Sequence, residues 1–407
     1  MRTAERASLC VTGCGTVNAL GGDRVSFWSG LLAGRCAIAP LGGRLAGDVP
    51  VLAAEVADLP SDAAGRPPEL AARRSRTDQL ALQAAEEAVR QAGDLQGVDR
   101  SRVAVVIGST TGGIREIEEH FIARDQGQLS PRSRLLLLEK ANTSDLLAAR
   151  FGFWGPRFTL NTACASGASA ILLGADLIAC GMADAALVGG ADALARLTLS
   201  GFRALRLIDQ APCRPFDRSR RGLSLGEGAG LLVLERRAVA GARGVPALAM
   251  LLGGAQTSDA HHLTAPRPDG AGAAAAMRAA IEDAGLTADA IDHINAHGTG
   301  TPANDAAEAA AIVSSLGPRA TGCPVTSIKG SIGHTLGAAG AIEAIAAIES
   351  LRSGAIPPTA GLREPDPALG LDLVRDAPRT GDWRIALSNS FGFGGSNAVL
   401  CFGKGEA

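Results

Sequence analysis

Short aliphatic segments alternate with longer helical patterns along almost the whole chain, and this alternation constrains the fold more than any other feature. Strand-like runs occur at 8–12, 102–107, 186–188, 231–234, 293–296, 325–327, 385–388 and 398–402. Helical patterns lie between them, at 78–92, 168–179, 272–284, 304–316 and 338–353. Strands that alternate with helices of this length predict an α/β fold with parallel or mixed sheets.

The chain length predicts more than one structural unit. Its 407 residues are too many for one small core, so we expect two α/β halves or two domains. A passage rich in Gly, Arg and Ala at 236–246 stands between two strand-like segments and predicts the junction. We therefore assign residues 1–240 to an N-terminal half and 241–407 to a C-terminal half. No clean sequence repeat relates the halves, so any duplication must be structural.

Charge and apolar patterning argue against several partners and locations. Lys and Arg number 39 against 41 Asp and Glu, and no basic run resembles a nucleic-acid arm. The first six residues lack the pattern of a signal peptide, and Asp176 and Asp184 interrupt the apolar stretch 165–190, which indicates a buried helix and strand and not a membrane span. The eight scattered cysteines fit reduced thiols. We expect a cytoplasmic enzyme with no metal site.

Cys164 stands in the run NTACASG at 161–167, directly ahead of the apolar helical pattern 168–179. A thiolate at a helix start is stabilised by the macrodipole and by amides without helical partners, which favours a nucleophile. The alternative is an inert buried thiol, because free cysteine is among the most buried residue types. The turn of small residues favours chemistry, since backbone can approach a ligand closely there.

Two further segments supply partners for a thiolate. His297 follows a strand in NAHGTGTP at 295–302, near the carboxyl end where α/β folds bind ligands, and His334 lies in KGSIGHTLGAAG at 329–340. Structural roles stay open for both, as a loop histidine and as a helix cap. Lys329 is either solvated or forms a partly buried ion pair with Glu308 that orients His334.

Two glycine-rich runs need separate interpretations. SNSFGFGGSN at 388–397 joins two apolar strands but lacks the Lys-Ser/Thr pair and following helix of a phosphate loop. A turn that offers an amide to an oxyanion is more consistent with the thiol hypothesis. The early run GCGTVN at 13–18 is a weak dinucleotide-binding match, and we predict a turn there.

The runs TACASG, NAHGTGTP, KGSIGHTLGAAG and SNSFGFGGSN, in this order, resemble the β-ketoacyl-acyl carrier protein synthases of the type II elongating class. The similarity extends from residues 11–13 through RPFD at 214–217 and GEG at 226–228 to the last strand. It implies a thiolase fold, with duplicated halves in a five-layered αβαβα arrangement and assembly as a dimer. It also implies that no cofactor is bound and that substrates arrive on the phosphopantetheine of an acyl carrier protein.

The resemblance implies a decarboxylative condensation in which each matched residue has a role. Cys164 accepts the acyl chain, and His297 and His334 promote decarboxylation of malonyl-carrier protein and stabilise its enolate. The chain on the thiol is thereby extended by two carbons. Lys329 and Glu308 match the family's supporting ion pair. Phe393 matches the family's gating phenylalanine. The backbone amides of Cys164 and Phe393 match its oxyanion hole.

Two surfaces follow from the same resemblance. We expect the acyl pocket to include Phe202 and Phe391. Carrier proteins are acidic, so a local basic patch matters more than net charge, although a merely solvated face is an equal alternative. The arginines expected to contact the carrier protein are Arg73, Arg74, Arg76, Arg203 and Arg206.

Two rival functions and one question of pathway stay open. A degradative thiolase needs a second cysteine in the C-terminal glycine-rich loop, and residues 391–397 contain none. A non-catalytic chain-length-factor-like subunit lacks the nucleophile, whereas this chain has Cys164. The short connection 205–214 and the segments 112–151 and 211–217 resemble ketosynthases of polyene or highly reducing type II polyketide pathways more than fatty-acid enzymes. The partner is then a second copy or a chain-length-factor-like subunit.

Overall fold

A computed structural model describes residues 8–42, 45, 51–57, 59, 74–138 and 142–405. Within these residues, eleven strands form one sheet in the order β13-β11-β10-β15-β16-β9-β1-β8-β6-β4-β5. β1 (Leu9–Asn18) and β9 (Ala249–Ser258) are antiparallel neighbours at its centre. The sheet therefore divides into two wings, one on each side of this central pair.

The two wings have the same strand order. From β1 outward, the N-terminal wing contains β8 (Gly228–Arg236), β6 (Ala185–Asp192), β4 (Val103–Gly108) and β5 (Arg157–Leu160). From β9 outward, the C-terminal wing contains β16 (Ser396–Lys404), β15 (Ile385–Gly392), β10 (His293–Asn295) and β11 (Pro324–Thr326), with β13 (Asp372–Leu373) at the edge. If the five strands nearest the centre of each wing are numbered by their order along the chain, both wings have the order 1-5-4-2-3 from the centre outward. This shared order confirms the expected structural duplication.

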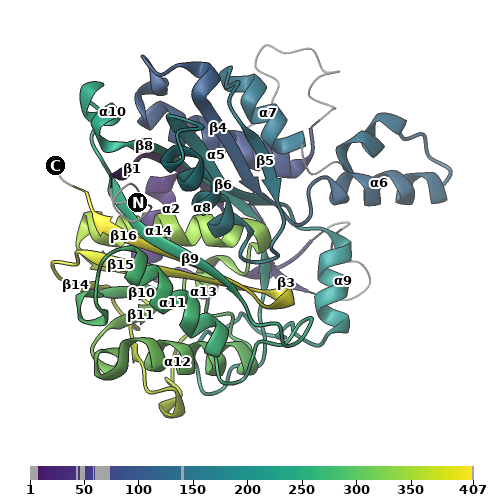
Figure 1. The fold of residues 1–407 in the computed structure, drawn as a ribbon. Coiled ribbons are helices and arrows are strands. Elements are labelled where there is room, and N and C mark those ends of the chain that lie inside the picture. The colour runs from purple at the N-terminus through teal and green to yellow at the C-terminus, as the bar shows by residue number, and fades with distance from the viewer. Residues whose placement is uncertain are drawn as a thin grey trace.

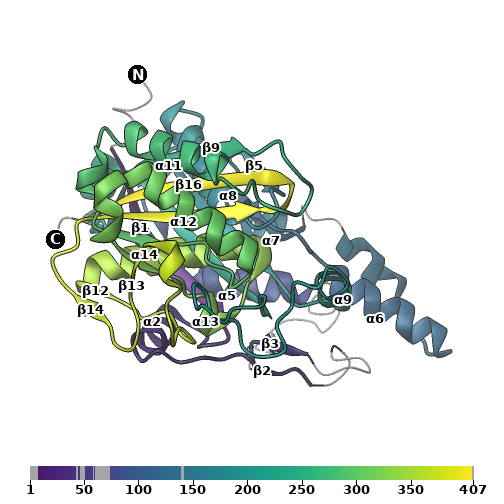
Figure 2. The same cartoon turned by 90° about the horizontal axis from the view of Figure 1, so that it is seen from below.

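Helices complete five layers (Figures 1 and 2). α8 (Ser166–Ala179) and α14 (Ala339–Ser353) lie between the wings and contact strands of both. α5 (Arg76–Gln91) and α7 (Asn142–Phe151) cover the outer face of the N-terminal wing, and α11 (Ala271–Asp283) covers that of the C-terminal wing beside α12 (Pro302–Leu316). Nearly every position of α14 is buried, as expected of a middle-layer helix.

Alternation along β4 explains how one strand serves two cores. Val103, Val105 and Ile107 belong to the apolar cluster beneath α5, whereas Ala104 and Val106 belong to the central cluster around α8 and α14. Successive strand side chains point to opposite faces, so a continuous apolar run is the pattern of a strand covered on both sides.

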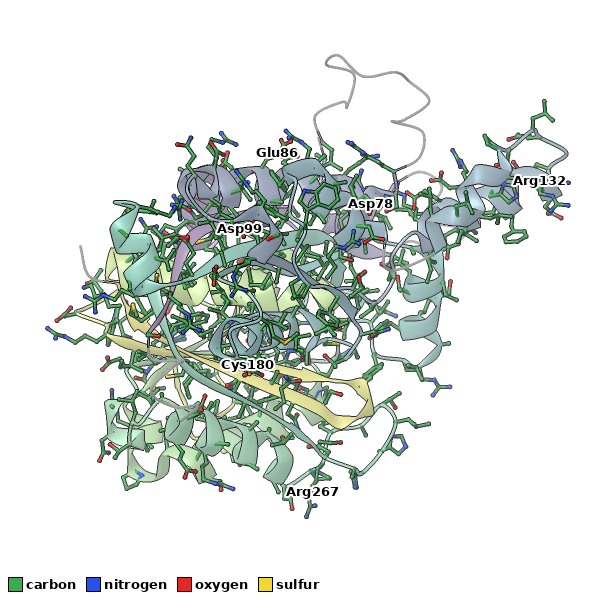
Figure 3. All side chains as sticks on the ribbon, turned by 45° about the horizontal axis from the view of Figure 1, so that its top comes forward. Asp78, Glu86, Asp99, Arg132, Cys180 and Arg267 are labelled. Atoms are coloured by element: carbon green, nitrogen blue, oxygen red, sulfur yellow. The ribbon has the colours of Figure 1, made fainter. Side chains whose placement is uncertain are left out.

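The remaining elements are short or peripheral. α6 (Ile114–Asp125) and the 3₁₀ helix η3 (Arg132–Leu138) project from the body in both ribbon views, and Figure 3 labels Arg132 on this projection. Among the described residues, no helix is both long and apolar enough to cross a bilayer. The other helices and strands are α2 (Arg24–Leu32), β2 (Ala39–Pro40), β3 (Leu52–Ala54), α9 (Arg196–Ala204), β7 (Leu225–Gly226), α10 (Arg237–Ala242), α13 (Lys329–Ile332), β12 (Ala355–Ile356) and β14 (Arg379–Thr380). The other 3₁₀ helices are η1 (Gly93–Leu95), η2 (Arg100–Arg102), η4 (Ala288–Ala290), η5 (Gly317–Thr321), η6 (Leu336–Ala338), η7 (Pro367–Leu369) and η8 (Phe393–Gly395).

All eight predicted strands and all five predicted helices overlap observed ones, but the turn predicted at 13–18 is wrong. Those residues belong to β1, and their glycines are required by packing. A Cβ atom at Gly13 would lie 2.0 Å from the Ala88 carbonyl oxygen, and one at Gly15 would lie 2.1 Å from that of Ala84. Glycine therefore allows α5 to lie directly against the central strand.

Candidate active site

The reactive side chains predicted from the motifs meet where parallel strands end. Cys164 follows β5, His297 follows β10, Lys329 follows β11, and His334 lies after α13. Ligand sites of α/β folds form at such carboxyl ends. One potential ligand atom each of Cys164, His297 and His334 lies within 4.8 Å of the others, and all three residues are buried. The fold thus brings a thiol and two imidazoles from both halves together.

The turn that carries Cys164 has an uncommon backbone conformation. Ala163 has a φ of 50°, in the left-handed region that residues with a Cβ seldom adopt. The hydroxyl of Ser166 donates to the Ala163 carbonyl at 2.6 Å. A Cβ at Gly167 would lie 2.9 Å from Ala341 N, so glycine permits α8 and α14 to cross closely. The nucleophile is fixed at this crossing.

Each imidazole is held through its Nδ1 atom. His334 Nδ1 accepts the Leu336 amide at 3.2 Å, and His297 Nδ1 lies 3.3 Å from Lys329 Nζ, an ammonium that can only donate. The neutral rings therefore carry their protons on Nε2. The ring centroids lie 5.3 Å apart, and His334 Nε2 has no partner among the described residues. The two Nε2–H groups are thus oriented as donors for a substrate.

Lys329 pairs with Glu343, so the predicted pairing with Glu308 is wrong. Its ammonium bonds to the Glu343 carboxylate and the His297 carbonyl, and the side chains of the pair are 1% and 2% exposed. Glu308 instead accepts the amides of His297 and Gly298, at 2.8 and 2.7 Å. Glu343 reaches the ammonium because α14 packs across the site, while Glu308 on α12 faces the end of β10.

The thiol and the two imidazoles of the site are neutral at rest. Burial raises the pKa of the Cys164 thiol to about 11, and the Lys329 ammonium and Phe393 amide oppose only part of this shift. Desolvation therefore outweighs the stabilisation of a thiolate that we expected from the helix start. Burial, and then repulsion by Lys329, lowers the pKa values of His297 and His334 well below 6.5. The thiol becomes nucleophilic only as its proton leaves.

The glycine-rich end of the β15–β16 hairpin faces the nucleophile. The Phe393 amide donates a hydrogen bond to Cys164. A Cβ at Gly392 would lie 3.0 Å from Cys164 N, so glycine leaves that amide uncovered. Gly394, with a φ of 78°, makes the turn that follows. Both amides predicted for an oxyanion hole therefore lie beside the thiol, and their role in the reaction stays a prediction.

A cavity of about 420 Å³ opens beside the thiol. Phe202 and Phe391, which we predicted to form the acyl pocket, both line it. Phe202 of α9 stacks on Phe393 with 5.3 Å between ring centroids. Phe393, the predicted gating residue, therefore lies in the cavity wall against Phe202. Cys164 is the only cysteine among the described lining residues. The wall also includes Leu205, Leu207, Leu223, Thr264, Ala265, Pro266, Thr299 and Thr301.

The same three reactive side chains are close enough to hold a metal ion, but their protonation suits an anion. The Lys329 ammonium, 3.3 Å from His297 Nδ1, repels a cation at this centre, and each imidazole directs an N–H toward it. The donors therefore fit a substrate oxygen on which negative charge develops.

Comparison with known proteins decides the family. The model described as "Beta-ketoacyl synthase, N-terminal domain" matches residues 7–240, and "Beta-ketoacyl synthase, C-terminal domain" matches residues 248–363. The protein belongs to the β-ketoacyl synthase family. These matches cover most of the chain and confirm the resemblance inferred from the four motifs. The protein is accordingly a ketosynthase, an acyltransferase.

Relatives of this ketosynthase match it over nearly its full length. It is 40% identical over 400 residues to "Nodulation protein E" of Rhizobium meliloti (strain 1021), covering 96% of this chain and 98% of that protein. It is 37% identical over 415 residues to "3-oxoacyl-[acyl-carrier-protein] synthase 2" of Synechocystis sp., covering 99% and 100%. The solved structure named "The ishigamide ketosynthase/chain length factor" matches with a TM-score of 0.89 and 34% identity, over 98% and 99% of the two chains. The thiolase fold is confirmed.

The arginines predicted to bind a carrier protein have different environments in this ketosynthase. Arg76 is bound to the fully buried Glu227 at 2.9 Å through Nε, so its assignment to a docking surface is wrong. Arg203 and Arg206 are exposed on and after α9, and Arg206 lines the cavity mouth. Arg74 is partly buried, and Arg73 lies outside the described residues.

Sequence reasoning missed two buried carboxylates that hold loops of the ketosynthase site. Asp192 accepts the amide of Gly337 at 2.7 Å, three residues after His334. Asp305 accepts the amides of Thr299 and Gly300 at 3.1 and 3.2 Å, two and three residues after His297. Asp192 acts across 145 residues of sequence, so no local signal identified it.

Proposed function

We propose that Cys164 holds an acyl chain while His297 and His334 promote decarboxylation of a malonyl thioester, whose carbanion then extends the chain by two carbons. The observation that carries the proposal is the placement of one buried thiol beside two imidazoles that have a fixed Nε2–H donor. The substrates are delivered on the phosphopantetheine of an acyl carrier protein. No bound cofactor is needed for this chemistry.

The first step is a thioester exchange. The Cys164 sulfur bonds to the acyl carbonyl carbon as the carbon–sulfur bond to phosphopantetheine breaks, and the thiol proton leaves with the pantetheine sulfur. Because burial raises the thiol pKa to about 11, deprotonation accompanies attack and does not precede it. The amides of Cys164 and Phe393 donate to the oxyanion of the tetrahedral intermediate.

The second step generates the carbon nucleophile. The carbon–carbon bond to the malonyl carboxylate breaks, CO₂ leaves, and the electron pair moves onto the thioester oxygen as an enolate. The Nε2–H groups of His297 and His334 donate to this oxygen. Neutral imidazoles suit the task because their protons stay on the rings throughout, and the depressed pKa values keep both rings neutral at physiological pH.

The third step joins the two substrates. The enolate carbon attacks the acyl carbonyl on Cys164, the carbon–sulfur bond breaks, and the sulfur regains a proton from solvent. The product is a β-ketoacyl chain on the carrier protein. The apolar cavity walls contributed by Phe202, Phe391 and Leu223 fit a hydrocarbon chain better than a charged one.

The proposal includes a pathway and a location. We assign the reaction to type II polyketide synthesis of polyene type or to fatty acid synthesis, with a cytoplasmic location and a boundary between halves at residue 240. The polyketide assignment is supported by 34% identity to a chain of the structure named "The ishigamide ketosynthase/chain length factor", and the fatty acid assignment by 37% identity to the Synechocystis synthase. The mass of the products gives the length of the chain that the protein makes.

The proposed assembly is a dimer with a second copy or with a chain-length-factor-like subunit. Among the residues that the structure describes, β5 is the outermost strand of the N-terminal wing and pairs with β4 alone, so its outer edge can accept a partner strand. Trp154 is 69% exposed and Phe158 on β5 is 42% exposed beside that edge. Exposed aromatic residues at a sheet edge favour a protein partner.

Mass spectrometry of carrier-bound products tests the condensation. The wild-type protein, given acyl- and malonyl-carrier protein with and without a candidate partner subunit, is expected to form a β-ketoacyl product two carbons longer. Cys164→Ala is expected to form none, while Cys180→Ala, at an exposed cysteine labelled in Figure 3, retains full yield. Product formation by Cys164→Ala would sink the assignment. Thioester cleavage by coenzyme A would instead support a degradative thiolase.

A further inference from the structure

A surface loop at 259–267 is docked on the glycine-rich end of the β15–β16 hairpin. Gly394 N donates to the Leu263 carbonyl at 2.8 Å, and Asp259 N donates to the Gly395 carbonyl at 2.9 Å. The Asn397 amide also donates to the Asp259 carboxylate at 2.8 Å. The position of this loop is therefore tied to the segment that carries Phe393.

His262 organises the loop from within. Its Nδ1 atom accepts the backbone amides of Thr264 and Ala265, both at 3.1 Å. An Nδ1 atom that accepts two amides fixes the neutral tautomer with its proton on Nε2. Thr264, Ala265 and Pro266 line the cavity, whereas His262 itself does not. The imidazole thus shapes a wall of the site without touching the thiol.

We propose that His262 is a positioning residue for carrier-bound substrates. It holds the 264–266 wall in place and, through the Leu263 carbonyl, the hairpin end that follows Phe393. This inference rests on the proposed function, because the cavity must admit a pantetheine thioester. Figure 3 labels Arg267 of this loop at the surface of the molecule.

The geometry predicts which substitutions preserve the role. Asparagine at 262 places its side-chain oxygen at the distance from the backbone that Nδ1 occupies, so it can accept both amides. Glutamine displaces its acceptor by one methylene, and alanine removes it. His262→Asn is therefore the conservative variant. His261→Ala changes the exposed neighbour outside the cavity lining and serves as the matched control.

Steady-state kinetics with malonyl-carrier protein tests the proposal. We expect His262→Ala and His262→Gln to raise KM about fivefold with kcat within twofold, as loss of two exposed hydrogen bonds predicts. His262→Asn and His261→Ala are expected to match the wild type. An unchanged KM in His262→Ala, or equal impairment in His262→Asn, would overturn the proposal.

Amide hydrogen exchange separates this proposal from the proposed function, because it needs no substrate. Exchange at Thr264, Ala265 and Gly394 is expected to be about fivefold faster in His262→Ala than in the wild type, and to be restored in His262→Asn. Unchanged exchange at these amides would refute the positioning role even if the wild type is active. A wild type without condensation activity would refute the proposed function, and the exchange data would still decide the role of His262.

Discussion

Replacement of His334 separates decarboxylation from acyl transfer. The His334 side chain is 1% exposed, its Nδ1 accepts the Leu336 amide at 3.2 Å, and its Nε2 has no partner among the described residues. His334→Ala therefore removes one preorganised donor for the enolate oxygen. Loss of a single donor of this kind costs about 10²- to 10³-fold in rate, or about 3–4 kcal/mol of transition-state stabilisation. In the proposed mechanism, acylation of Cys164 depends on the backbone amides and not on His334, so its rate is expected to change less than about tenfold.

Two assays and two further variants make the prediction specific. Decarboxylation is measured as CO₂ release from malonyl-carrier protein, and acylation as the rate of mass increase with acyl-carrier protein. His334→Gln keeps an N–H near the Nε2 position and is expected to regain part of the decarboxylation rate, whereas His334→Asn places its amide near Nδ1 and is not. Equal loss of both reactions in His334→Ala, or decarboxylation within tenfold of wild type, would refute the reasoning.

Three other variants test the electrostatics. Lys329→Met removes a charge that lowers the pKa of His297, so the acid limb of the kcat profile is expected to move to higher pH; an unmoved limb contradicts this. Burial lowers the pKa of His293 from 6.5 to about 4, so its contribution to stability is present above pH 6.5 and is lost as pH falls toward 4. In urea titrations, His293→Gln should reduce that fall in the free energy of unfolding by about 3 kcal/mol. The same pH dependence in the variant and the wild type would show that His293 does not have a lowered pKa. Arg76→Ala leaves Glu227 without its main partner and should lower the free energy of unfolding by about 3 kcal/mol, with the affinity for carrier protein unchanged. Weaker carrier binding in a stable variant would show that Arg76 belongs to the docking surface.

The sequence predicted the parts of this site that local patterns determine. Cys164, His297 and Lys329 each follow a strand, and strand ends in an α/β fold share one edge, so their proximity follows from order along the chain. The turn predicted at 13–18 failed because the glycines serve the contact between α5 and β1, which leaves no local trace.

The interactions that the sequence did not predict are long-range side-chain pairs. Glu343 meets Lys329 only because α14 crosses between the wings, and Arg76 meets Glu227 across 151 residues of sequence. The raised pKa of the Cys164 thiol could not be predicted from the sequence for a related reason. A helix start is visible in the sequence, but the desolvation that outweighs it depends on the whole fold.

Formation of an acyl adduct on Cys164 tests the central claim most directly. The protein is incubated with acyl-carrier protein, its intact mass is measured, and the modified residue is located by peptide mapping. Our account predicts a mass increase equal to one acyl group, located on Cys164 and absent from Cys164→Ala. No adduct with any acyl-carrier protein, in the presence of a partner subunit, or an adduct on another residue, would contradict it and favour a non-catalytic chain-length-factor-like role.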